Sequence, residues 1–349
     1  MPAPPSALER LAFATNAAPG LFLDLVGTGG LRAAHAGLKL GIFEALRDSP
    51  RSGEELAAAL KLEPRALGAV LELLAATGYL QQAAGRYGNT ALTTKWLLRG
   101  SPQNIGALVS FWQEIVFPFW DQHLLSTVRE GAPPMTLYQW MDQHPGQWPI
   151  AQAWFRDAAR LVAAEVVAKV PLDGSARRLL DVGGGHGEFS AAFCRAHAGL
   201  QATILDQPAA LALTRDTLRA AGMEARITLQ EGDFERGKLG VGYDAVLLFN
   251  VLHGLGPAQC QELLRKASEA LITGGRVAIL DNFRGRALGP ATAAFVPLLG
   301  VVYLVALGGR VHDDDDVAAW LRDAGFEGVQ RKELRNAPGT SVVLARKAG

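Results

Sequence analysis

The chain has 349 residues, more than one typical domain needs, and this length favours two domains. Lys and Arg total 34 and Asp and Glu total 34, so the overall charge does not favour nucleic acid or an anionic membrane surface as a partner. The two cysteines, Cys194 and Cys260, lie far apart without metal-ligand spacing, which predicts buried thiols in a reducing compartment.

The distribution of apolar residues along the chain does not predict a membrane protein. The N-terminus lacks the basic stretch and apolar core of a signal peptide. The longest apolar run, residues 295–307, has 13 residues, whereas a spanning helix needs roughly 20. We therefore predict a soluble, cytoplasmic protein that binds neither a membrane nor nucleic acid.

Residues 1–100 are predicted to form a first, mostly helical domain. Apolar residues at helical spacing predict one amphipathic helix over residues 31–46. Ser52, followed three residues later by Glu55, predicts a capping box at the start of a second helix. Pro64 predicts the start of a third helix, because proline is tolerated in the first turn.

A small hairpin is predicted after these helices. Gly78 ends the third helix, and residues 79–94 alternate around a turn at Gly88–Asn89. Three helices and a hairpin make the winged-helix arrangement, which raises DNA binding as a hypothesis. The third helix carries only Arg65 and Glu72 among Ala, Leu and Val, whereas a DNA-reading helix needs several polar side chains facing the groove. We therefore predict that this helix packs against protein.

Residues 101–170 are predicted to form a helical segment rich in aromatic side chains. Five of the seven Trp residues of the chain fall in this stretch. Most of its aromatic residues are expected to pack in the core or between domains, and some to wall an apolar pocket. We assign Trp112, Trp154 and Phe155 to that pocket.

Residues 171–349 alternate between strand and helix patterns, which predicts a parallel sheet with helices on both faces. The five predicted strands cover residues 177–183, 202–207, 227–233, 243–251 and 276–282. The three predicted helices between them cover residues 188–198, 210–222 and 257–275.

The predicted sheet ends differently from how it begins. Residues 328–335 and 341–347 both have strand patterns and are separated by only a few residues. A parallel crossover needs a dozen or more residues, so these two strands are predicted to be antiparallel.

A glycine-rich turn, residues 181–189, follows the first predicted strand. Gly183, Gly185 and Gly187 form G-x-G-x-G, whereas the dinucleotide fingerprint is G-x-G-x-x-G and Glu188 stands at its third glycine. The turn therefore allows a ligand to approach the backbone closely. It does not require that the ligand carry a pyrophosphate for the start of the helix to neutralise.

Two acidic residues at the following strand ends extend this pattern. Asp206 ends the second strand, where a carboxylate can accept hydrogen bonds from both ribose hydroxyls. Asp233 ends the third strand, where it can accept from an adenine amino group while Phe234 packs on the ring. A single Asp at either place is compatible with a solvated strand end, but the turn and both acids in order predict a nucleoside-containing cofactor.

The chain resembles the S-adenosylmethionine-dependent O-methyltransferase family that includes plant caffeic acid and flavonoid methyltransferases and bacterial polyketide-tailoring enzymes. The resemblance covers nearly the whole chain and rests on the predicted winged helix, the antiparallel end of the sheet, and the motifs LLDVGGGHG, LDQP, EGDF and NVLHGL. It implies a Rossmann-like class I methyltransferase domain over residues 171–349, a winged-helix-like dimerisation domain over 1–100, a linking pocket segment over 101–170, and a homodimer.

The resemblance also implies S-adenosylmethionine as cofactor. The family's cofactor-contacting Lys falls on Phe249 here, so Phe249 and Asn250 are expected to line the methionine end differently. The cofactor residues implied in this chain are Gly183, Gly184, Gly185, Asp206, Asp233, Phe234, Phe249 and Asn250.

His253 follows the fourth predicted strand, at the edge where sheets of this class bind ligands. By the resemblance, His253 matches the family's catalytic histidine and Asp281 a carboxylate that orients it. A histidine there can accept the proton of a phenol and so make it a better nucleophile. A second family acid falls on Val311, so part of the support is missing. A histidine that only orients substrate or caps the turn is the alternative.

Residues 295–307 are predicted to form a buried helix. From its place between the fifth strand and the last helix, it is expected to wall the substrate pocket with Val296, Leu299 and Tyr303, joined by Asn282 at the strand end. His312 and the four Asp residues after it suggest a metal site. Consecutive acids before a helix more often cap it and suit its dipole, so we predict no metal.

We therefore predict a homodimeric O-methyltransferase that acts on a hydroxyl of an apolar, aromatic or polyketide-like small molecule. Two alternatives stay open. The first is a family member that keeps the cofactor but catalyses a cyclisation, decarboxylation or hydroxylation. The second is a ligand-sensing regulator that uses the winged helix.

Overall fold

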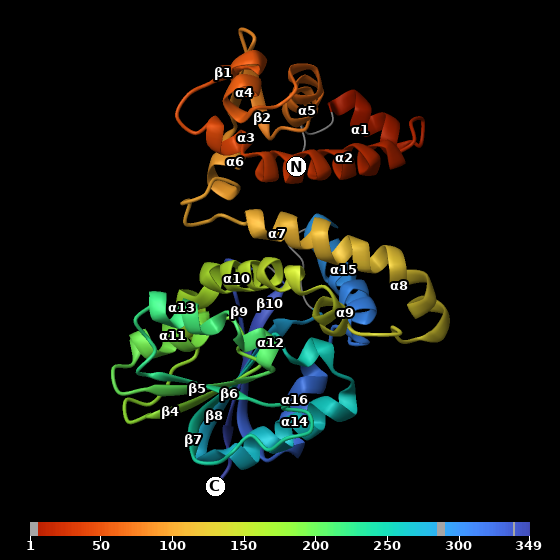
Figure 1. Cartoon of the computed structure of the whole chain (residues 1–349). Helices are drawn as coiled ribbons and strands as arrows, with labels where there is room; N and C mark the ends of the chain where they lie inside the picture. Colours follow the sequence, from red (N-terminus) through yellow and green to blue (C-terminus); the bar gives the residue numbers. More distant parts are fainter. Residues whose placement is uncertain (1–5, 285–289, 338) are drawn as a thin grey trace. The chain divides into compact units, whose positions relative to one another are not determined.

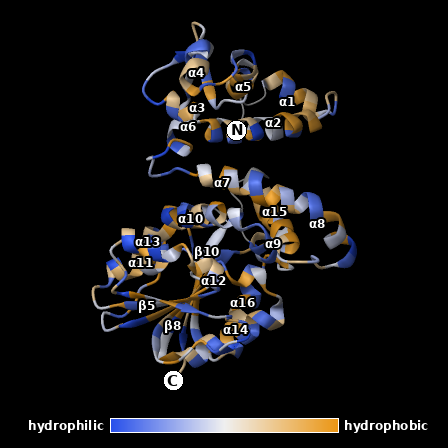
Figure 2. Cartoon of the chain, in the orientation of Figure 1, coloured by the Kyte–Doolittle hydropathy of each residue, from blue (hydrophilic) through white to orange (hydrophobic). Residues whose placement is uncertain are grey.

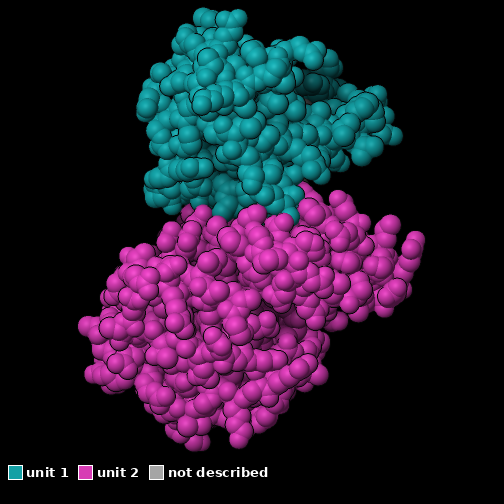
Figure 3. All heavy atoms as spheres, in the orientation of Figure 1, with its two compact units in different colours: residues 1–114 teal, residues 115–349 magenta. Residues whose placement is uncertain are grey.

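The structure is a computed structural model that describes residues 6–284, 290–337 and 339–349. The contacts of the chain divide it into two compact units, Met1–Glu114 and Ile115–Gly349 (Figure 1, Figure 3). The division into three domains with boundaries near residues 100 and 170 stays a prediction.

The first unit consists mainly of helices around a small sheet. Its helices are α1 (Ala7–Ala14), α2 (Leu21–Leu40), α3 (Ile42–Ala45), α4 (Gly53–Leu60), α5 (Pro64–Ala76), α6 (Ala91–Trp96) and α7 (Gly106–Phe111). Its strands are β1 (Arg51–Ser52), β2 (Leu80–Ala83) and β3 (Arg86–Asn89), in the order β1-β3-β2.

Several local predictions are confirmed in this unit. Ser52 and Glu55 form both hydrogen bonds of a capping box at the start of α4. Helix α5 begins at Pro64, and Gly78, in a left-handed conformation, follows its end. Strands β2 and β3 pair antiparallel as a hairpin. The helices enclose a core that includes Phe43 and Leu71.

Two local predictions are wrong. Residues 31–46 form two helices, because Gly41 takes a left-handed conformation (φ 75°) and ends α2 there. The hairpin turn lies at Ala84–Gly85, both with positive φ, while Gly88–Asn89 belongs to β3. The pattern misplaced the turn because a Gly-Asn pair signals a turn only where the strand register allows it.

The second unit contains a mixed sheet flanked by helices. The sheet consists of β4 (Arg178–Val182), β5 (Gln201–Asp206), β6 (Ile227–Glu231), β7 (Tyr243–Phe249), β8 (Leu271–Asn282), β9 (Phe326–Glu333) and β10 (Thr340–Lys347). Its helices are α8 (Phe117–Glu130), α9 (Leu137–Gln143), α10 (Trp148–Lys169), α11 (Glu188–Ala196), α12 (Pro208–Leu211), α13 (Thr214–Ala220), α14 (Pro257–Ala270), α15 (Pro290–Leu307) and α16 (Asp314–Asp323). Short turns are the π-helix η1 (Trp112–Val116), which spans the division between the units, and the 3₁₀ helices η2 (Pro145–Gln147) and η3 (Leu252–Gly254).

The strand order is β6-β5-β4-β7-β8-β10-β9. The first five strands are parallel, and β10 pairs antiparallel with both β8 and β9. The predicted parallel sheet that ends in an antiparallel pair is therefore confirmed. The reversal of strand order between β4 and β7 makes the carboxyl edge of the sheet the expected ligand crevice.

Two predicted helices of this unit have different bounds in the structure. The helix predicted over residues 257–275 ends at Ala270, because Leu271 already pairs with Tyr243 in the parallel ladder as β8 begins. The helix predicted over residues 210–222 is interrupted and forms α12 and α13. Tertiary pairing overrides local helix propensity at the first of these places.

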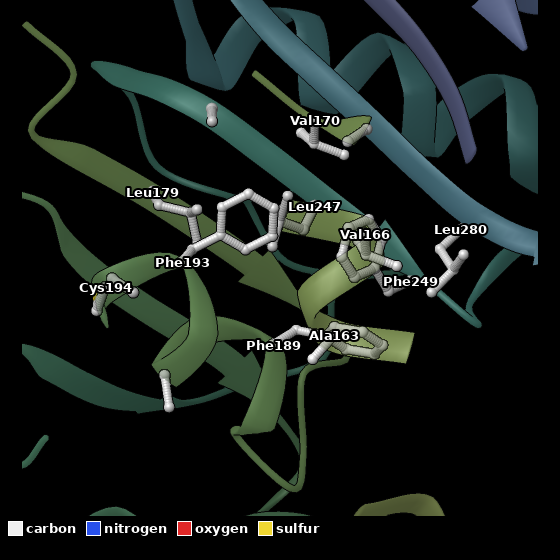
Figure 4. Packing of buried hydrophobic residues seen from close by; sticks show 14 of the residues in the cluster. Ala163, Val166, Val170, Leu179, Phe189, Phe193, Cys194, Leu247, Phe249 and Leu280 are labelled. Atoms are coloured by element: carbon white, nitrogen blue, oxygen red, sulfur yellow. The ribbon is translucent and has the colours of Figure 1, made fainter. Parts of the chain in front are cut away.

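Alternating side chains of β7 pack into separate cores on the two faces of the sheet. Leu247 and Phe249 belong to one core, with residues of α10 and α11, while Val246 and Leu248 belong to the other, with residues of α14 and α16. Figure 4 shows the first of these cores, where Phe249 lies near Phe189. Burial on both faces rigidly fixes the strand ends that carry the site.

Helix α15 is apolar along its length, as predicted, and is coloured largely hydrophobic in Figure 2. Val302, Tyr303, Val305 and Ala306 are buried, but Phe295, Leu298 and Val301 are exposed, so the helix predicted to be buried is buried only in part. Among the residues that the structure describes, no helix has the length and apolar character needed to cross a membrane.

Candidate active site

The glycine-rich turn between β4 and α11 lies at the carboxyl edge of the sheet. Gly183 has a φ of 70°, and its N–H donates to the carbonyl of Leu205 on the neighbouring strand (2.8 Å). A Cβ at Gly184 would lie 2.4 Å from the carboxyl carbon of Asp181. These two positions therefore require glycine, and the turn leaves its backbone open to a ligand.

Asp206 at the end of β5 is tied to the glycine turn. Its Oδ2 accepts from the N–H of Gly185 (2.9 Å), and its Oδ1 accepts from the N–H of Gln207 (2.7 Å). Burial raises the pKa of the Asp206 carboxyl, while these two hydrogen bonds oppose the rise. The hydroxyl of Thr214 donates to the carbonyl of Gly185 and fixes the turn from the other side.

Asp233 was predicted to end the third strand, but β6 ends at Glu231, so Asp233 and Phe234 lie just after the strand. Asp233 is half-exposed, and its Oδ1 accepts from the N–H of Glu235 (2.8 Å), which forms an Asx turn. The Phe234 ring packs against the core and comes within 3.9 Å of a Cβ placed at Gly183. Gly183, Asp206 and Phe234 are thus drawn to one edge of the sheet.

Asp181, the last acid of β4, lies beneath the glycine turn. Burial raises the pKa of its carboxyl to about 7, although the Ser190 hydroxyl donates to its Oδ2 (2.7 Å). The second oxygen, Oδ1, is buried and has no hydrogen-bond partner among the described residues. A buried acceptor without a partner is costly, and it suits a site that a polar ligand completes.

His253 lies on η3, directly after β7, and faces Asp281 at the end of β8. The ring Nδ1 of His253 lies 2.8 Å from Asp281 Oδ1, and the backbone N–H of His253 donates to Oδ2 (3.1 Å). The N–H of Asn282 donates to Oδ1 as well (2.8 Å). The buried Asp281 carboxylate thus fixes the Nδ1–H tautomer, which leaves a lone pair on Nε2.

Tyr303 of α15 covers the other side of this histidine. Its ring stacks on the His253 imidazole, with centroids 3.9 Å apart and planes 13° from parallel. The Tyr303 hydroxyl accepts from Asn282 Nδ2 (2.8 Å), and Asn282 Oδ1 accepts from the Thr340 hydroxyl (3.1 Å). Two residues predicted to wall the substrate pocket, Asn282 and Tyr303, therefore contact the candidate base or each other.

The chain after α15 holds the η3 turn in place. The N–H of Arg310 donates to the carbonyl of His253 (2.9 Å). The Nε2 of the buried His312 lies 3.0 Å from the carbonyl of Leu252 and 3.1 Å from that of Leu255. His312 thus supports the turn that carries His253, and among the described residues no group of three or more His, Cys, Asp or Glu side chains could hold a metal ion.

The remaining predicted pocket residues lie in several places. Val296 and Leu299 are half-buried on α15, and Val296 lies close to Gly339. Trp154 and Phe155 are half-buried on α10. Trp112 is half-buried at the start of η1 and belongs to the first unit. Their roles stay predictions.

Two predicted cofactor residues at the end of β7 behave differently from each other. The Phe249 ring packs edge-on against Phe189 (4.9 Å between centroids) and belongs to the core beneath the sheet (Figure 4). Asn250 is exposed at the carboxyl edge and has a left-handed backbone (φ 57°), a conformation that asparagine tolerates. Only Asn250 of this pair presents its side chain outside the core.

Sequence reasoning did not assign Tyr138 of α9 to the site. The charge of Asp206 and, more strongly, burial raise the pKa of Tyr138 to about 12. The same phenol also interacts electrostatically with Tyr303 and stacks on Trp148 (6.0 Å, 11°). Tyr138 is therefore near enough to both Asp206 and Tyr303 to interact with them electrostatically, and its only signal in the sequence was a place in the aromatic-rich stretch.

Residues 32–99 match the O-methyltransferase dimerisation domain, and residues 128–327 match the O-methyltransferase domain. The chain belongs to the S-adenosylmethionine-dependent O-methyltransferase family. It is therefore an enzyme of this family, and the ligand-sensing regulator finds no support.

Relatives match along almost the whole chain. The 3-hydroxy-5-methyl-1-naphthoate 3-O-methyltransferase of Streptomyces sahachiroi is 32% identical over 342 residues, which cover 95% of this chain and 96% of the relative. The L-tyrosine C(3)-methyltransferase of Streptomyces lavendulae is 29% identical over 343 residues, which cover 94% and 92%. The solved structure of PigF with SAH aligns with a TM-score of 0.80 and 26% identity, covering 98% of this chain and 100% of that one.

Proposed function

We propose that this enzyme methylates a hydroxyl of an aromatic small molecule with His253 as general base. The observation that carries the proposal is the 2.8 Å contact between His253 Nδ1 and the buried Asp281 carboxylate. That contact holds the proton on Nδ1, so the Nε2 lone pair can accept the proton of an acceptor hydroxyl. The carboxylate also stabilises the imidazolium that forms.

The residues at the carboxyl edge fit S-adenosylmethionine. The glycine turn has no room for a Cβ at Gly184, and the neighbouring buried Asp181 Oδ1 has no hydrogen-bond partner within residues 6–284, 290–337 and 339–349. Asp206 would accept from ribose hydroxyls, Asp233 from the adenine amino group, and Phe234 would pack on the base. When bound, this cofactor supplies a methyl group activated by its positively charged sulfur.

The protein's share of the reaction is to orient the acceptor and remove its proton. Positioning two reactants supplies a large part of the acceleration in such displacements, and a general base adds about 10²–10⁴-fold. Asp281 fixes the tautomer of His253, Tyr303 fixes the plane of its ring, and Arg310 fixes its backbone carbonyl. The base is therefore held from three sides.

The acceptor class is inferred from the relatives and from the aromatic residues on the pocket elements. The Streptomyces sahachiroi relative carries a name that specifies a hydroxynaphthoate. In this chain, the Tyr303 ring stacks on His253, and Trp154 and Phe155 are half-buried on α10. A flat apolar phenol or naphthol is the substrate that such walls favour.

The proposal is tested by mass spectrometry of S-adenosylhomocysteine and methylated product over a panel of phenols, naphthols and hydroxynaphthoates. We expect equimolar formation of both products, and a loss of about 10²–10⁴-fold in rate for His253→Ala with unchanged cofactor affinity. His197→Ala, at a half-buried helix end, is the matched control that keeps full activity.

Two results would contradict parts of this proposal. A converted acceptor without S-adenosylhomocysteine would favour the alternative in which the cofactor is kept but not consumed. A full rate in His253→Ala would remove the histidine from the role of base, even if methyl transfer occurs.

We also propose that the enzyme is a homodimer built on its first unit. The dimerisation match begins at residue 32, within α2. The first half of α2 precedes the matched region and exposes several apolar side chains, Leu21, Phe22, Leu23, Leu25 and Val26. Exposed patches of this kind mark protein interfaces.

Light scattering should give twice the chain mass for the wild type. The double variant Phe22→Glu with Leu25→Glu should give a monomer. The control Val241→Glu, on an exposed loop, should stay dimeric.

A further inference from the structure

The His253 ring has two described neighbours that differ in chemistry. Asp281 contacts its Nδ1 from β8, and Tyr303 lies flat on its face from α15. In the family pattern, a second acid would come from the segment after α15, but Val311 stands at that place and is buried. The apolar Val311 side chain gives the His253 imidazolium no second negative charge in addition to that of Asp281. The Tyr303 ring, which stacks on the imidazole, is therefore the second group that supports His253.

We propose that Tyr303 is a positioning residue for His253. The face of the Tyr303 ring stabilises the protonated His253 imidazole in place of the missing second carboxylate. The proposal rests on His253 being the base of the proposed function. A cation over an aromatic face is attracted by the electron density of the ring, and more strongly where water is excluded. The 3.9 Å separation and the 13° angle are those of such a contact.

The Tyr303 ring is itself held in register. Asn282 Nδ2 donates to its hydroxyl (2.8 Å), and Thr340 on β10 donates to Asn282 Oδ1 (3.1 Å). Asn282 directly follows Asp281, so both partners of His253 are fixed by one strand end. The hydrogen bonds from Thr340 to Asn282 and from Asn282 to Tyr303 thus connect the Tyr303 ring to the sheet that carries the Asp281 carboxylate.

Other titratable groups around the base do not replace this support. Cys260 of α14 lies close to His312 (3.5 Å), and burial, followed by the charge of Asp281, raises the pKa of its thiol to about 12, so it is neutral. Arg310 contacts His253 through its backbone N–H, which donates to the His253 carbonyl, and its charge acts on Cys260. Burial and then the Asp281 charge raise the pKa of Tyr303 well above its ordinary value, so the phenol keeps its proton.

The test compares Tyr303→Phe, which keeps the ring, with Tyr303→Leu, which keeps only the apolar bulk. The readout is the ring carbon signals of ¹³C-labelled histidine, followed by NMR against pH, with His253→Ala to assign the His253 signal. In Tyr303→Leu we expect the midpoint of the His253 titration to fall by about 0.5–1 pH unit, because the imidazolium loses its aromatic face. In Tyr303→Phe we expect a smaller fall, because the ring face remains while the hydrogen bond from Asn282 is lost.

An independent readout is the pH dependence of methyl transfer to whichever acceptor of the panel is converted. We expect the acid limb to move with the NMR midpoint, and the plateau of Tyr303→Leu to fall about threefold to tenfold, since a weaker base removes the proton more slowly. The affinity for S-adenosylhomocysteine should stay unchanged in both variants, which reports an intact cofactor site.

Equal midpoints in the wild type, Tyr303→Leu and Tyr303→Phe would overturn the proposal. Asn282→Ala gives a second route if Tyr303→Leu does not fold, because releasing the Tyr303 hydroxyl should move the midpoint in the same direction by a smaller amount. Failure of the proposed function has a different signature, since the rate of His253→Ala would then equal that of the wild type whatever the titration shows.

Discussion

Asp206 is the last residue of β5 and Asp281 the second-last residue of β8 in the same sheet, yet their carboxylates have different hydrogen-bond partners. The Asp206 oxygens accept from the backbone of its own loop and of the glycine turn. The Asp281 oxygens accept from the backbone and the ring of His253 and from the backbone of Asn282. In the proposed function, the Asp206 carboxylate shapes the cofactor-binding surface, and the Asp281 carboxylate orients His253.

The two halves of the site also differ in how they are built. The Asp206 half comes from consecutive strand ends and the turns after them, β4, β5 and β6. The His253 half needs α15 and the chain at Arg310 and His312, which follow β8 in sequence and fold back onto η3. The proposed cofactor site thus depends on the local structure of the sheet edge, while the proposed base depends on packing between elements that are distant in sequence.

The sharpest way to break this comparison is Asp281→Asn. An amide at this position can donate to Nδ1 and favour the tautomer with its proton on Nε2, which cannot accept a proton. We expect the rate of methyl transfer to fall about 10²–10⁴-fold while calorimetry gives an unchanged affinity for S-adenosylhomocysteine. Asp313→Asn, half-exposed before α16, is the control. A loss of cofactor affinity equal to the loss of rate would assign both carboxylates to binding.

The converse variant is Asp206→Ala. It removes the acceptor proposed for the ribose hydroxyls, and hydrogen bonds to charged groups contribute about 1.5–3 kcal/mol each. Calorimetry should show affinity for S-adenosylmethionine falling about 10²–10³-fold. Asp216→Ala, exposed on α13, should bind as the wild type does. Wild-type affinity in Asp206→Ala would place the ribose elsewhere.

Gly184→Ala tests whether the turn itself is a close-fitting surface. The added methyl would lie 2.4 Å from the Asp181 carboxyl carbon, so the turn must shift. We expect a loss of about 1–3 kcal/mol in the free energy of unfolding, measured by urea titration. Gly174→Ala, which has no atom within 4 Å of the added methyl, should be close to neutral. Equal stability of the two variants would contradict the crowding beneath the turn.

Asp181 should make the stability of the protein depend on pH. Burial raises its pKa from an ordinary value near 3.8 to about 7, so the folded state holds a proton that the unfolded chain releases. The free energy of unfolding should therefore fall between about pH 4 and pH 7, by about 1.4 kcal/mol per pH unit from this group. Asp181→Asn should remove that slope, so the variant gains on the wild type as pH rises. A constant difference between them would refute the assignment.

His186, in the same turn, should act with the opposite sign and over a narrower range. Burial, followed by the charges of Arg156 and Arg160, lowers its pKa from 6.5 to about 4. The unfolded chain then binds a proton that the folded state excludes, so stability falls as pH drops from about 6.5 towards 4. His186→Asn should be less sensitive to acid than the wild type, as measured by thermal unfolding at pH 7 and pH 4.5. Equal sensitivity of the two proteins would speak against a neutral, enclosed imidazole.

The sequence by itself determined the order of the site along the chain. The glycine turn, Asp206, Asp233 and His253 follow successive strands, and strand alternation places their ends on one edge whatever the rest of the fold does. The family resemblance then pairs Asp281 with His253. The capping box at Ser52 and the antiparallel end of the sheet are equally local, because they depend on spacing of a few residues.

Only the tertiary structure decided what those residues contact. The stack of Tyr303 on His253 joins positions fifty apart, and the register of β8 turned residues 271–275 from helix into strand. Phe249 follows the same rule, since the alternation of β7 sends its ring into the core and leaves Asn250 at the edge. Spacing along a chain sets which edge a residue reaches, but packing of distant elements sets which side chain meets it there.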